Sequence, residues 1–242
     1  MKKNKIVVLR AGEAAPEVSA RRGEFFGWIQ RELASAFDGA LVEHDIRKLD
    51  VPLPKVDDAD AFVITGSPSN VTERAEWMLR AEAFIREAAE RETPLFGICF
   101  GHQLIGEALG GKVAKNPFGR EIGTVEVRVR AHVPRDPIFD GIPDRFQANY
   151  SHMESVVKLP PSAKLLAETE LEPHAAYSVG ERVKCVQFHP EFDGDTMRGY
   201  VEARAHLIVK EGNDPKPLLE GATDTPHGAE TLRNFVRHVI PH

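Results

Sequence analysis

The chain has few cysteines and no long apolar run. Its 242 residues include only two cysteines, Cys99 and Cys185, which does not fit a fold held together by disulfides. No stretch approaches the roughly 18 consecutive apolar residues that a membrane-spanning helix needs. The apolar run at residues 6–9 is too short for the core of a signal peptide and ends at Arg10. We therefore expect a cytoplasmic protein with no membrane partner.

The chain also lacks an excess of positive charge. It carries 31 lysines and arginines against 37 aspartates and glutamates, a net charge of −6, and has no long basic run. The electrostatic footprint of a nucleic-acid-binding protein is missing, so no nucleic-acid partner is expected. With 42% hydrophobic and 28% charged residues, the composition is typical of a packed globular protein. We expect a single domain that spans residues 1–242.

Short β-branched runs alternate with helical patterns in the first half of the chain. These runs predict strands at residues 6–9, 41–46, 61–65 and 95–98. Apolar residues at helical spacing predict helices at about 24–37 and 73–91. Such alternation is typical of parallel strands joined by crossover helices. The expected fold class is therefore α/β, with an open, mostly parallel sheet flanked by helices.

The pattern changes to shorter runs after residue 112. Strict alternation at residues 124–129 and apolar runs at 178–179 and 183–188 predict a smaller antiparallel extension. Two helices are predicted to close the chain, at about 195–210 and 228–240. A loop that contains Pro, Gly and Asp is predicted between them.

The most informative segment surrounds Cys99. A predicted strand runs into Gly97-Ile98-Cys99-Phe100-Gly101 and then into a helical pattern. This is the thiol form of a nucleophile elbow, in which glycines two positions before and after the nucleophile avoid collisions across a tight turn. The helix start favours the thiolate, and the backbone amide of Phe100 can face a developing oxyanion. Cys185 lacks this context and is predicted to be a core residue.

A thiol nucleophile needs a neighbouring base, and ten histidines are available. His189 is favoured because it ends a predicted strand, where α/β sheets assemble their sites. Alternation along an extended chain puts Glu191 on the same side, so that its carboxylate can orient the imidazole. His102 falls in the helix after Cys99 and is interpreted as a residue that packs there or supports the site from behind. His152 lies in a predicted loop and either lines the pocket or is solvated.

Two motifs stand out together: GICFGHQ at residues 97–103 and QFHPE at residues 187–191. Jointly they resemble the class I, triad-type glutamine amidotransferase family. Residues 64–71 are similar to the family's oxyanion strand, and residues 232–235 are similar to its last helix. Within the family, the sequence looks most like the amidotransferase part of GMP synthase. The resemblance implies a flavodoxin-like three-layer fold and hydrolysis of the γ-amide of glutamine through a γ-glutamyl thioester, which releases ammonia.

The resemblance also implies catalytic roles. Cys99 would attack the amide carbon, His189 would take and return the proton, and Glu191 would orient His189. The oxyanion would be held by backbone amides of Phe100 and of the turn at Gly66 and Ser67. Neither a cofactor nor a metal site is expected.

Contacts with the glutamyl substrate are implied for four further residues: Gln103, Ser151, His152 and Met153. Two positions depart from the usual family pattern. Ser67 stands where the family usually has Gly before the proline of the oxyanion turn, and Met153 stands where a small residue is usual. Both changes bear on whether free glutamine is the substrate.

Three interpretations of function follow. The chain ends about fifty residues past Glu191, which leaves no room for the ATP-pyrophosphatase domain of a GMP synthase, so we expect a free-standing module. It is then a glutaminase that passes ammonia to a separate synthetase, or a self-sufficient γ-glutamyl peptide or amide hydrolase, which suits the altered pocket. The third alternative is a non-catalytic binding protein on the same scaffold. The first two act on a small-molecule substrate, and a homodimer is left open.

Overall fold

One large sheet organises the structure, a computed structural model that describes residues 4–131 and 134–241. Its strand order is β2-β1-β3-β4-β11-β10-β9-β6-β7. Neighbouring strands run parallel in the first part of this order, which consists of β2 (Ala40–Asp45), β1 (Lys5–Arg10), β3 (Ala61–Ile64), β4 (Leu95–Ile98) and β11 (Val183–Val186). Strands β1 to β4 were expected as parallel strands. Strand β11 was expected, over residues 183–188, in the antiparallel extension; it pairs with β10 in antiparallel but with β4 in parallel, and it ends two residues earlier.

The antiparallel extension continues the same sheet. It consists of β10 (Ala176–Val179), β9 (Ala163–Glu168), β6 (Glu121–Val129) and β7 (Arg145–His152). A separate two-stranded sheet pairs β5 (Lys112–Lys115) with β8 (Glu154–Lys158). The α/β fold with a smaller antiparallel part is therefore confirmed. The loop predicted around His152 is wrong, because His152 is the last residue of β7.

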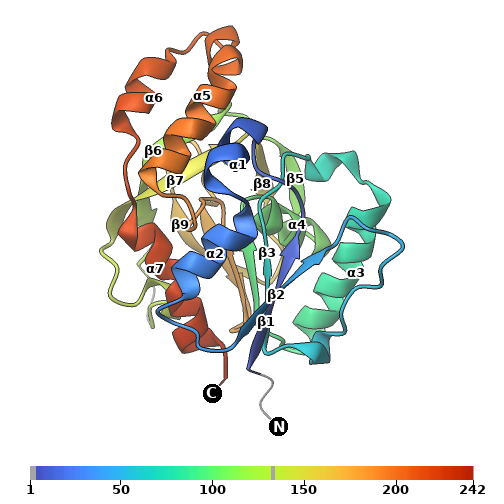
Figure 1. Ribbon diagram of the computed structural model, residues 1–242. Coiled ribbons are helices and arrows are strands. Elements are labelled where there is room, and N and C mark those ends of the chain that lie inside the picture. Colours follow the sequence, from blue (N-terminus) through green and yellow to red (C-terminus); the bar gives the residue numbers. More distant parts are fainter. Residues whose placement is uncertain (1–3, 132–133, 242) are drawn as a thin grey trace.

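Helices cover both faces of the parallel strands (Figure 1). Two of them, α2 (Phe25–Leu33) and α7 (Pro226–Asn234), lie on one face, and α7 continues into a π-helical turn at Phe235–Val239. The other face carries α3 (Glu76–Glu90) and α4 (Phe100–Ala108). Three short 3-10 helices lie in the connections, at Val56–Asp58, Val71–Glu73 and Pro137–Phe139.

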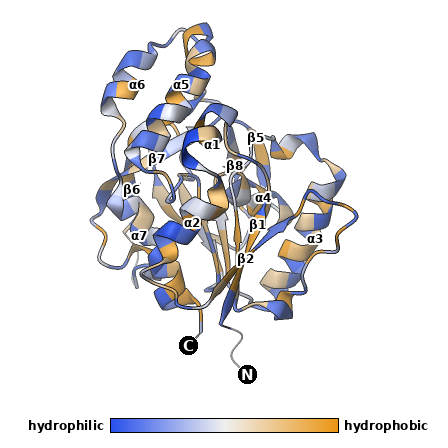
Figure 2. Ribbon diagram, in the orientation of Figure 1, coloured by the Kyte–Doolittle hydropathy of each residue, from blue (hydrophilic) through white to orange (hydrophobic). Residues whose placement is uncertain are grey.

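Strand β1 shows how the sequence specifies this layering. Ile6 and Val8 pack in one core with Ile29 and Leu33 of α2, whereas the alternate residues of the strand pack in the opposite core with α3 and α4. A strand that is buried on both faces reads as a continuous apolar run, which is why no polar alternation interrupts residues 6–9. Figure 2 shows the hydrophobic colours gathered along these central strands.

Three further helices lie near the edge at which the parallel strands end, opposite the two termini (Figure 1). They are α1 (Pro16–Arg22), α5 (Gly194–Lys210) and α6 (Pro215–Gly221). Helix α5 begins at Asp193, whose side chain accepts a hydrogen bond from Thr196 N. Helices α1 and α6 were not predicted, and α6 occupies the stretch predicted as a loop. Among the helices of residues 4–131 and 134–241, none is long and apolar enough to cross a membrane.

Candidate active site

Cys99 sits in a strained turn between β4 and α4. Its φ of 50° and ψ of −99° lie in a region that residues with a side chain rarely adopt. The turn is tight: a Cβ atom on Gly97 would lie 2.8 Å from the backbone of Gly101, and one on Gly101 would lie 2.4 Å from the carbonyl oxygen of Ile64. Both glycines are thus required by close approach, as the sequence pattern predicts.

His189 reaches the same place from a neighbouring strand. Strand β11 pairs with β4 in parallel register, Val186 opposite Ile98, and the Cys99 amide donates to Val186 O over 2.9 Å. The residues that follow the two strands therefore meet at one edge of the sheet. His189 is fixed there because its backbone amide donates to Asn149 O over 2.8 Å.

Glu191 binds the imidazole of His189 through its Nδ1 atom. His189 Nδ1 donates to Glu191 Oε1 over 2.8 Å, and both side chains are buried. This bond leaves Nε2 as the nitrogen that can exchange a proton with the thiol or with a substrate. The structure thus brings the three predicted catalytic side chains together, in the order thiol, imidazole, carboxylate.

The electrostatics of the group favour charge separation between sulfur and imidazole. Burial alone would raise the pKa of Cys99, but the neighbouring imidazolium of His189 outweighs it and lowers that pKa below its usual value. Burial likewise opposes a charged His189, yet the Glu191 carboxylate and the Cys99 thiolate raise its pKa to about 10. A thiolate beside an imidazolium is a reactive nucleophile with a proton donor at hand.

The imidazole is also held by packing. The ring of Phe192 stacks on it with centroids 4.0 Å apart and planes 15° apart, and the ring of Phe25 lies parallel to it at 6.2 Å. On Gly66, a Cβ atom would come within 2.8 Å of His189 Cε1. Gly66, predicted as part of the oxyanion turn, therefore also leaves the space that the imidazole occupies.

A cavity of about 430 Å³ opens above the thiol and imidazole. It is lined by Cys99 and His189, by Ser67 and Pro68 of the turn after β3, and by Ser151 of β7. The thiol of Cys99 lies 4.0 Å from the carbonyl oxygen of Ser151. Further walls come from the segment that leads into α1 and from α5, including Tyr200 and Arg204. Neither of these two residues belongs to a motif in the sequence.

Phe100 and Gln103 both lie in α4 but face the protein. The side chain of Phe100, the first residue of α4, stacks on Trp77, so that only its backbone amide is offered at the helix start. Gln103 is buried, and its amide nitrogen donates to Glu154 O over 2.7 Å and to Gln187 Oε1 over 3.0 Å. The substrate contact expected of Gln103 stays a prediction.

The predicted substrate-binding segment divides among three places. Ser151 lines the cavity of Cys99, but His152 is turned into the protein, where its ring nitrogens bond to Glu121 Oε2 over 3.0 Å and to Glu154 O over 2.9 Å. His152 is buried, so the solvated alternative is wrong, and its side chain does not line that cavity. A contact of this residue with the substrate stays a prediction. Burial opposes its charge, but the hydrogen bond with Glu121 together with the negative charges of Glu172 and Glu121 raises the pKa of His152.

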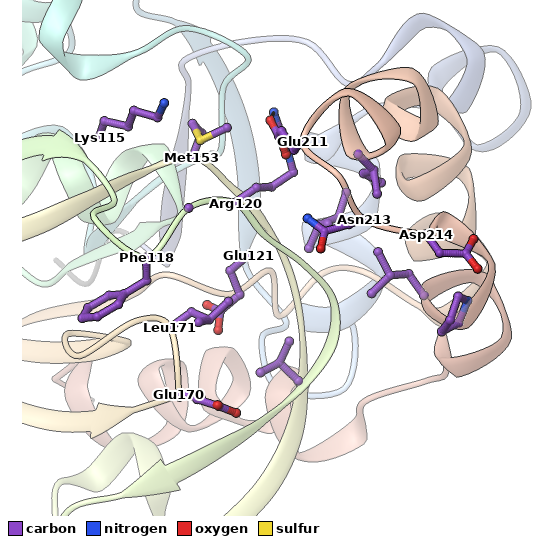
Figure 3. Close-up of a pocket in the computed structure, with 16 residues that line it drawn as sticks. Lys115, Phe118, Arg120, Glu121, Met153, Glu170, Leu171, Glu211, Asn213 and Asp214 are labelled. Carbon is purple, nitrogen blue, oxygen red and sulfur yellow. Dashed lines mark hydrogen bonds and ion pairs between the residues drawn. The ribbon is translucent and has the colours of Figure 1, made fainter.

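Met153 faces a second cavity, of about 680 Å³ (Figure 3). Figure 3 shows Met153 there with Arg120 and Glu211, which form an ion pair with nitrogen and oxygen 3.0 Å apart. Because Cys99 and His189 do not line this cavity, Met153 is separated from the thiol in this arrangement. A role of its side chain in substrate binding stays a prediction.

Two other predictions concern residues outside the reaction. His102 packs on Tyr177 and its Nε2 bonds to His174 O over 2.9 Å, while burial lowers its pKa to about 3. It is therefore a neutral packing residue, as expected. Cys185 is fully buried in the core, which confirms its interpretation, and burial raises its pKa to about 12.

Comparison with known proteins places this geometry in a family. The family model for class I glutamine amidotransferases matches residues 24–205. Gamma-glutamyl peptidase 4 of Arabidopsis thaliana is 29% identical over 184 residues, which cover 74% of this chain and 73% of the peptidase. The glutamine-hydrolyzing GMP synthase subunit of Archaeoglobus fulgidus is 34% identical over 168 residues, which cover 66% of this chain and 85% of that protein.

Longer GMP synthases and a solved structure are also similar to this chain. Two undivided GMP synthases, from Aeropyrum pernix and Clostridium novyi, are matched over only 24% of their own length. The crystal structure of a glutamine amidotransferase from Thermotoga maritima has the same fold, with a TM-score of 0.75, 23% identity and 98% of each chain covered. Together with the family model, which spans most of the sequence, these findings show that the chain belongs to the class I glutamine amidotransferase family.

Proposed function

We propose that the protein hydrolyses γ-glutamyl amide bonds through a γ-glutamyl thioester on Cys99. One observation carries the proposal: the thiol and the imidazole of His189 line one cavity, with Glu191 bonded to the far side of the ring. The charge separation between Cys99 and His189 supports it, because a thiolate needs no further activation before it attacks a carbonyl carbon.

In the proposed first step, the thiolate of Cys99 attacks the γ-carbonyl carbon of the substrate. The negative charge that develops on the carbonyl oxygen is held by the backbone amide of Phe100 and by one from the turn at Gly66 and Ser67. Each such donor is worth about 3 kcal/mol in enzymes that use an oxyanion hole. His189 Nε2 gives its proton to the departing nitrogen, so ammonia or an amine leaves and the thioester remains.

In the proposed second step, water enters where the amine has left. His189 Nε2, now neutral, takes a proton from this water as it attacks the thioester carbon. The carbon–sulfur bond breaks, glutamate is released, and the thiolate and imidazolium form again. Glu191 stabilises the imidazolium in both steps through its bond to Nδ1.

The substrate is glutamine if the protein serves a separate ammonia-accepting synthetase, and the likeness to the Archaeoglobus GMP synthase subunit supports this interpretation. A second candidate, hydrolysis of γ-glutamyl peptides by the protein alone, is favoured by two observations. The surroundings of the site favour a thiolate beside an imidazolium without a partner protein, because the pKa of Cys99 is lowered and that of His189 is raised to about 10. The cavity of about 430 Å³ also falls in the range that holds ligands larger than a side-chain amide.

The proposal is tested by incubating the pure protein with glutamine and with γ-glutamylglycine while ammonia, glycine and glutamate are measured. We expect release of glutamate from at least one substrate and a γ-glutamyl adduct on Cys99 in acid-quenched samples analysed by mass spectrometry. Cys99→Ala should lose turnover and keep the far-UV circular dichroism of the wild type. Undiminished hydrolysis by Cys99→Ala would refute the thioester route.

A further inference from the structure

One guanidinium in the cavity of Cys99 has no counter-ion. Arg204 projects from α5 and lies over the ring of Tyr200, one helical turn earlier, with its central carbon 5.0 Å from the ring centroid. Within residues 4–131 and 134–241, no hydrogen bond and no ion pair engages this guanidinium. In direct contact, its charge meets only the face of an aromatic ring, and the charges of the Cys99 thiolate and of Glu17 act on it from a distance.

Other arginines nearby are paired, which makes Arg204 unusual. Arg22 bonds to Asp193 at the start of α5, and Arg120 bonds to Glu211 just after its end. Arg204, by contrast, is half-buried against Tyr200. Burial lowers the pKa of Arg204, and the positive charge of Arg120 works in the same direction. An anion placed against this guanidinium would offset that cost.

Acidic side chains of the same cavity do not take this role. Glu13 is bound by Arg47, with nitrogen and oxygen 3.0 Å apart, and by Arg10 at 3.2 Å. Glu17 lies on α1 and forms no ion pair with Arg204, although its charge acts favourably on the guanidinium from a distance. The cavity therefore presents to a ligand one uncompensated cation together with the thiol and the imidazole.

We propose that Arg204 binds a carboxylate of the substrate while Cys99 attacks the γ-amide. This inference rests on the proposed function, because it assigns a specificity residue to that same cavity. A guanidinium offers two parallel N–H donors that match the two oxygens of a carboxylate, and the contact with the Tyr200 ring restrains its position. The carboxylate belongs either to the α-carbon of the glutamyl group or to the amino acid that leaves.

Two pairs of substrates distinguish these sources. The leaving part has a carboxylate in γ-glutamylglycine and lacks one in γ-glutamylglycinamide. The glutamyl part has an α-carboxylate in glutamine and lacks one in glutamine α-amide. We expect the wild type to prefer the carboxylate in one pair by on the order of 10- to 100-fold in kcat/KM, the size typical of charged hydrogen bonds. Arg204→Met should abolish that preference, and Arg204→Lys should restore part of it.

The matched control is Lys210→Met, which removes a positive charge from an exposed position of the same helix outside the cavity. It should keep the wild-type preference, and thermal melts should show that all variants fold. If the preference follows the leaving part, the leaving carboxylate is the ligand; if it follows the glutamyl part, the α-carboxylate is. An equal fall in kcat/KM for all four substrates in Arg204→Met would overturn the inference.

A measurement on the thiol alone separates this inference from the proposed function. Iodoacetate carries a carboxylate and iodoacetamide does not, and both alkylate Cys99 whether or not the protein hydrolyses anything. The ratio of the two rates should fall roughly 10-fold or more in Arg204→Met and stay unchanged in Lys210→Met. An unchanged ratio in Arg204→Met refutes anion binding at this residue, even where γ-glutamyl hydrolysis by the wild type is found.

Discussion

His189 Nδ1 donates to Glu191 Oε1 over 2.8 Å, although only Pro190 separates the two residues in the chain. The imidazole and the carboxylate that orients it thus come from one short segment after β11, whereas the thiol comes from the neighbouring strand β4. The imidazole and the carboxylate thus form a unit, which the pairing of two adjacent strands brings beside Cys99.

Glu191→Gln should slow turnover by roughly 100-fold or more, because the imidazolium loses the charge that stabilises it. In the wild type, the Glu191 carboxylate helps to raise the pKa of His189 to about 10. Without this charge, the pKa falls and the imidazolium is lost at lower pH. The basic limb of the kcat/KM profile should therefore move to lower pH. A variant with an unchanged basic limb would contradict this assignment.

The two cysteines should differ sharply in reactivity. At neutral pH, iodoacetamide should modify Cys99 quickly and leave Cys185 untouched in the folded protein, because one pKa is lowered and burial raises the other to about 12. Peptide mass spectrometry at timed intervals measures both rates. Cys185→Ala serves as the control and should not change the rate at Cys99; equal rates at the two cysteines would count against a thiolate at residue 99.

Gly66→Ala should impair catalysis more than folding. The added methyl group would lie 2.8 Å from His189 Cε1, so the imidazole must shift, and a displacement of about 1 Å can cost on the order of 100-fold in rate. The control is Gly27→Ala on the exposed side of α2, where nothing lies within 4 Å of the new atom. That variant should keep full activity and gain about 0.5–1 kcal/mol of stability; equal kinetics for both variants would refute the steric argument.

A buried ion pair far from the reaction should matter for stability alone. Lys184 Nζ lies 2.7 Å from Asp136 Oδ2, and the two side chains are 1% and 6% exposed. Asp136→Ala should lower the free energy of unfolding by about 3–5 kcal/mol, because it leaves a buried ammonium without a partner. Urea denaturation measures this loss.

The comparison for this prediction is the exposed pair of Arg145 and Glu126, whose side chains are 66% and 48% exposed. Arg145→Ala should cost less than about 1 kcal/mol. The double variant Asp136→Ala with Lys184→Met should recover part of the lost free energy of unfolding. If Asp136→Ala alone were as stable as the wild type, the ion pair would contribute nothing to stability.

The geometry around Cys99 and His189 could be predicted because it is local. Two glycines around Cys99 specify the tight turn whatever else the chain does, and the segment from His189 to Glu191 forms its hydrogen bond within three residues. The parallel strands β1, β3 and β4 were equally readable, since burial on both faces makes each of these three a short, mostly apolar run.

The missed features depend on distant contacts. Strand β7 was overlooked and His152 placed in a loop, although Phe146, Ala148, Tyr150 and His152 are all buried at every second position. The polar residues between and after them hid this alternation. Helices α1 and α6 are too short to show helical periodicity and begin with proline at the first turn, which reads equally well as a loop.

Arg204 could not be identified as a candidate binding residue from the sequence. Arginine at an exposed-looking position of a helix carries no motif, and what distinguishes it is the lack of a carboxylate around it in space. Only the position of α5 beside α1 and the thiol reveals that feature, because it brings together three segments that are far apart in the chain.

The backbone of Cys99 sets stability and chemistry against each other at one position. A residue held at φ 50° and ψ −99° costs about 1–3 kcal/mol, which glycine would largely avoid. Cys99→Gly should therefore unfold at a higher temperature than Cys99→Ala, which keeps the strain, and both should be inactive. Stability alone would favour glycine here, so the proposed nucleophile occupies a position at which its side chain costs the fold free energy.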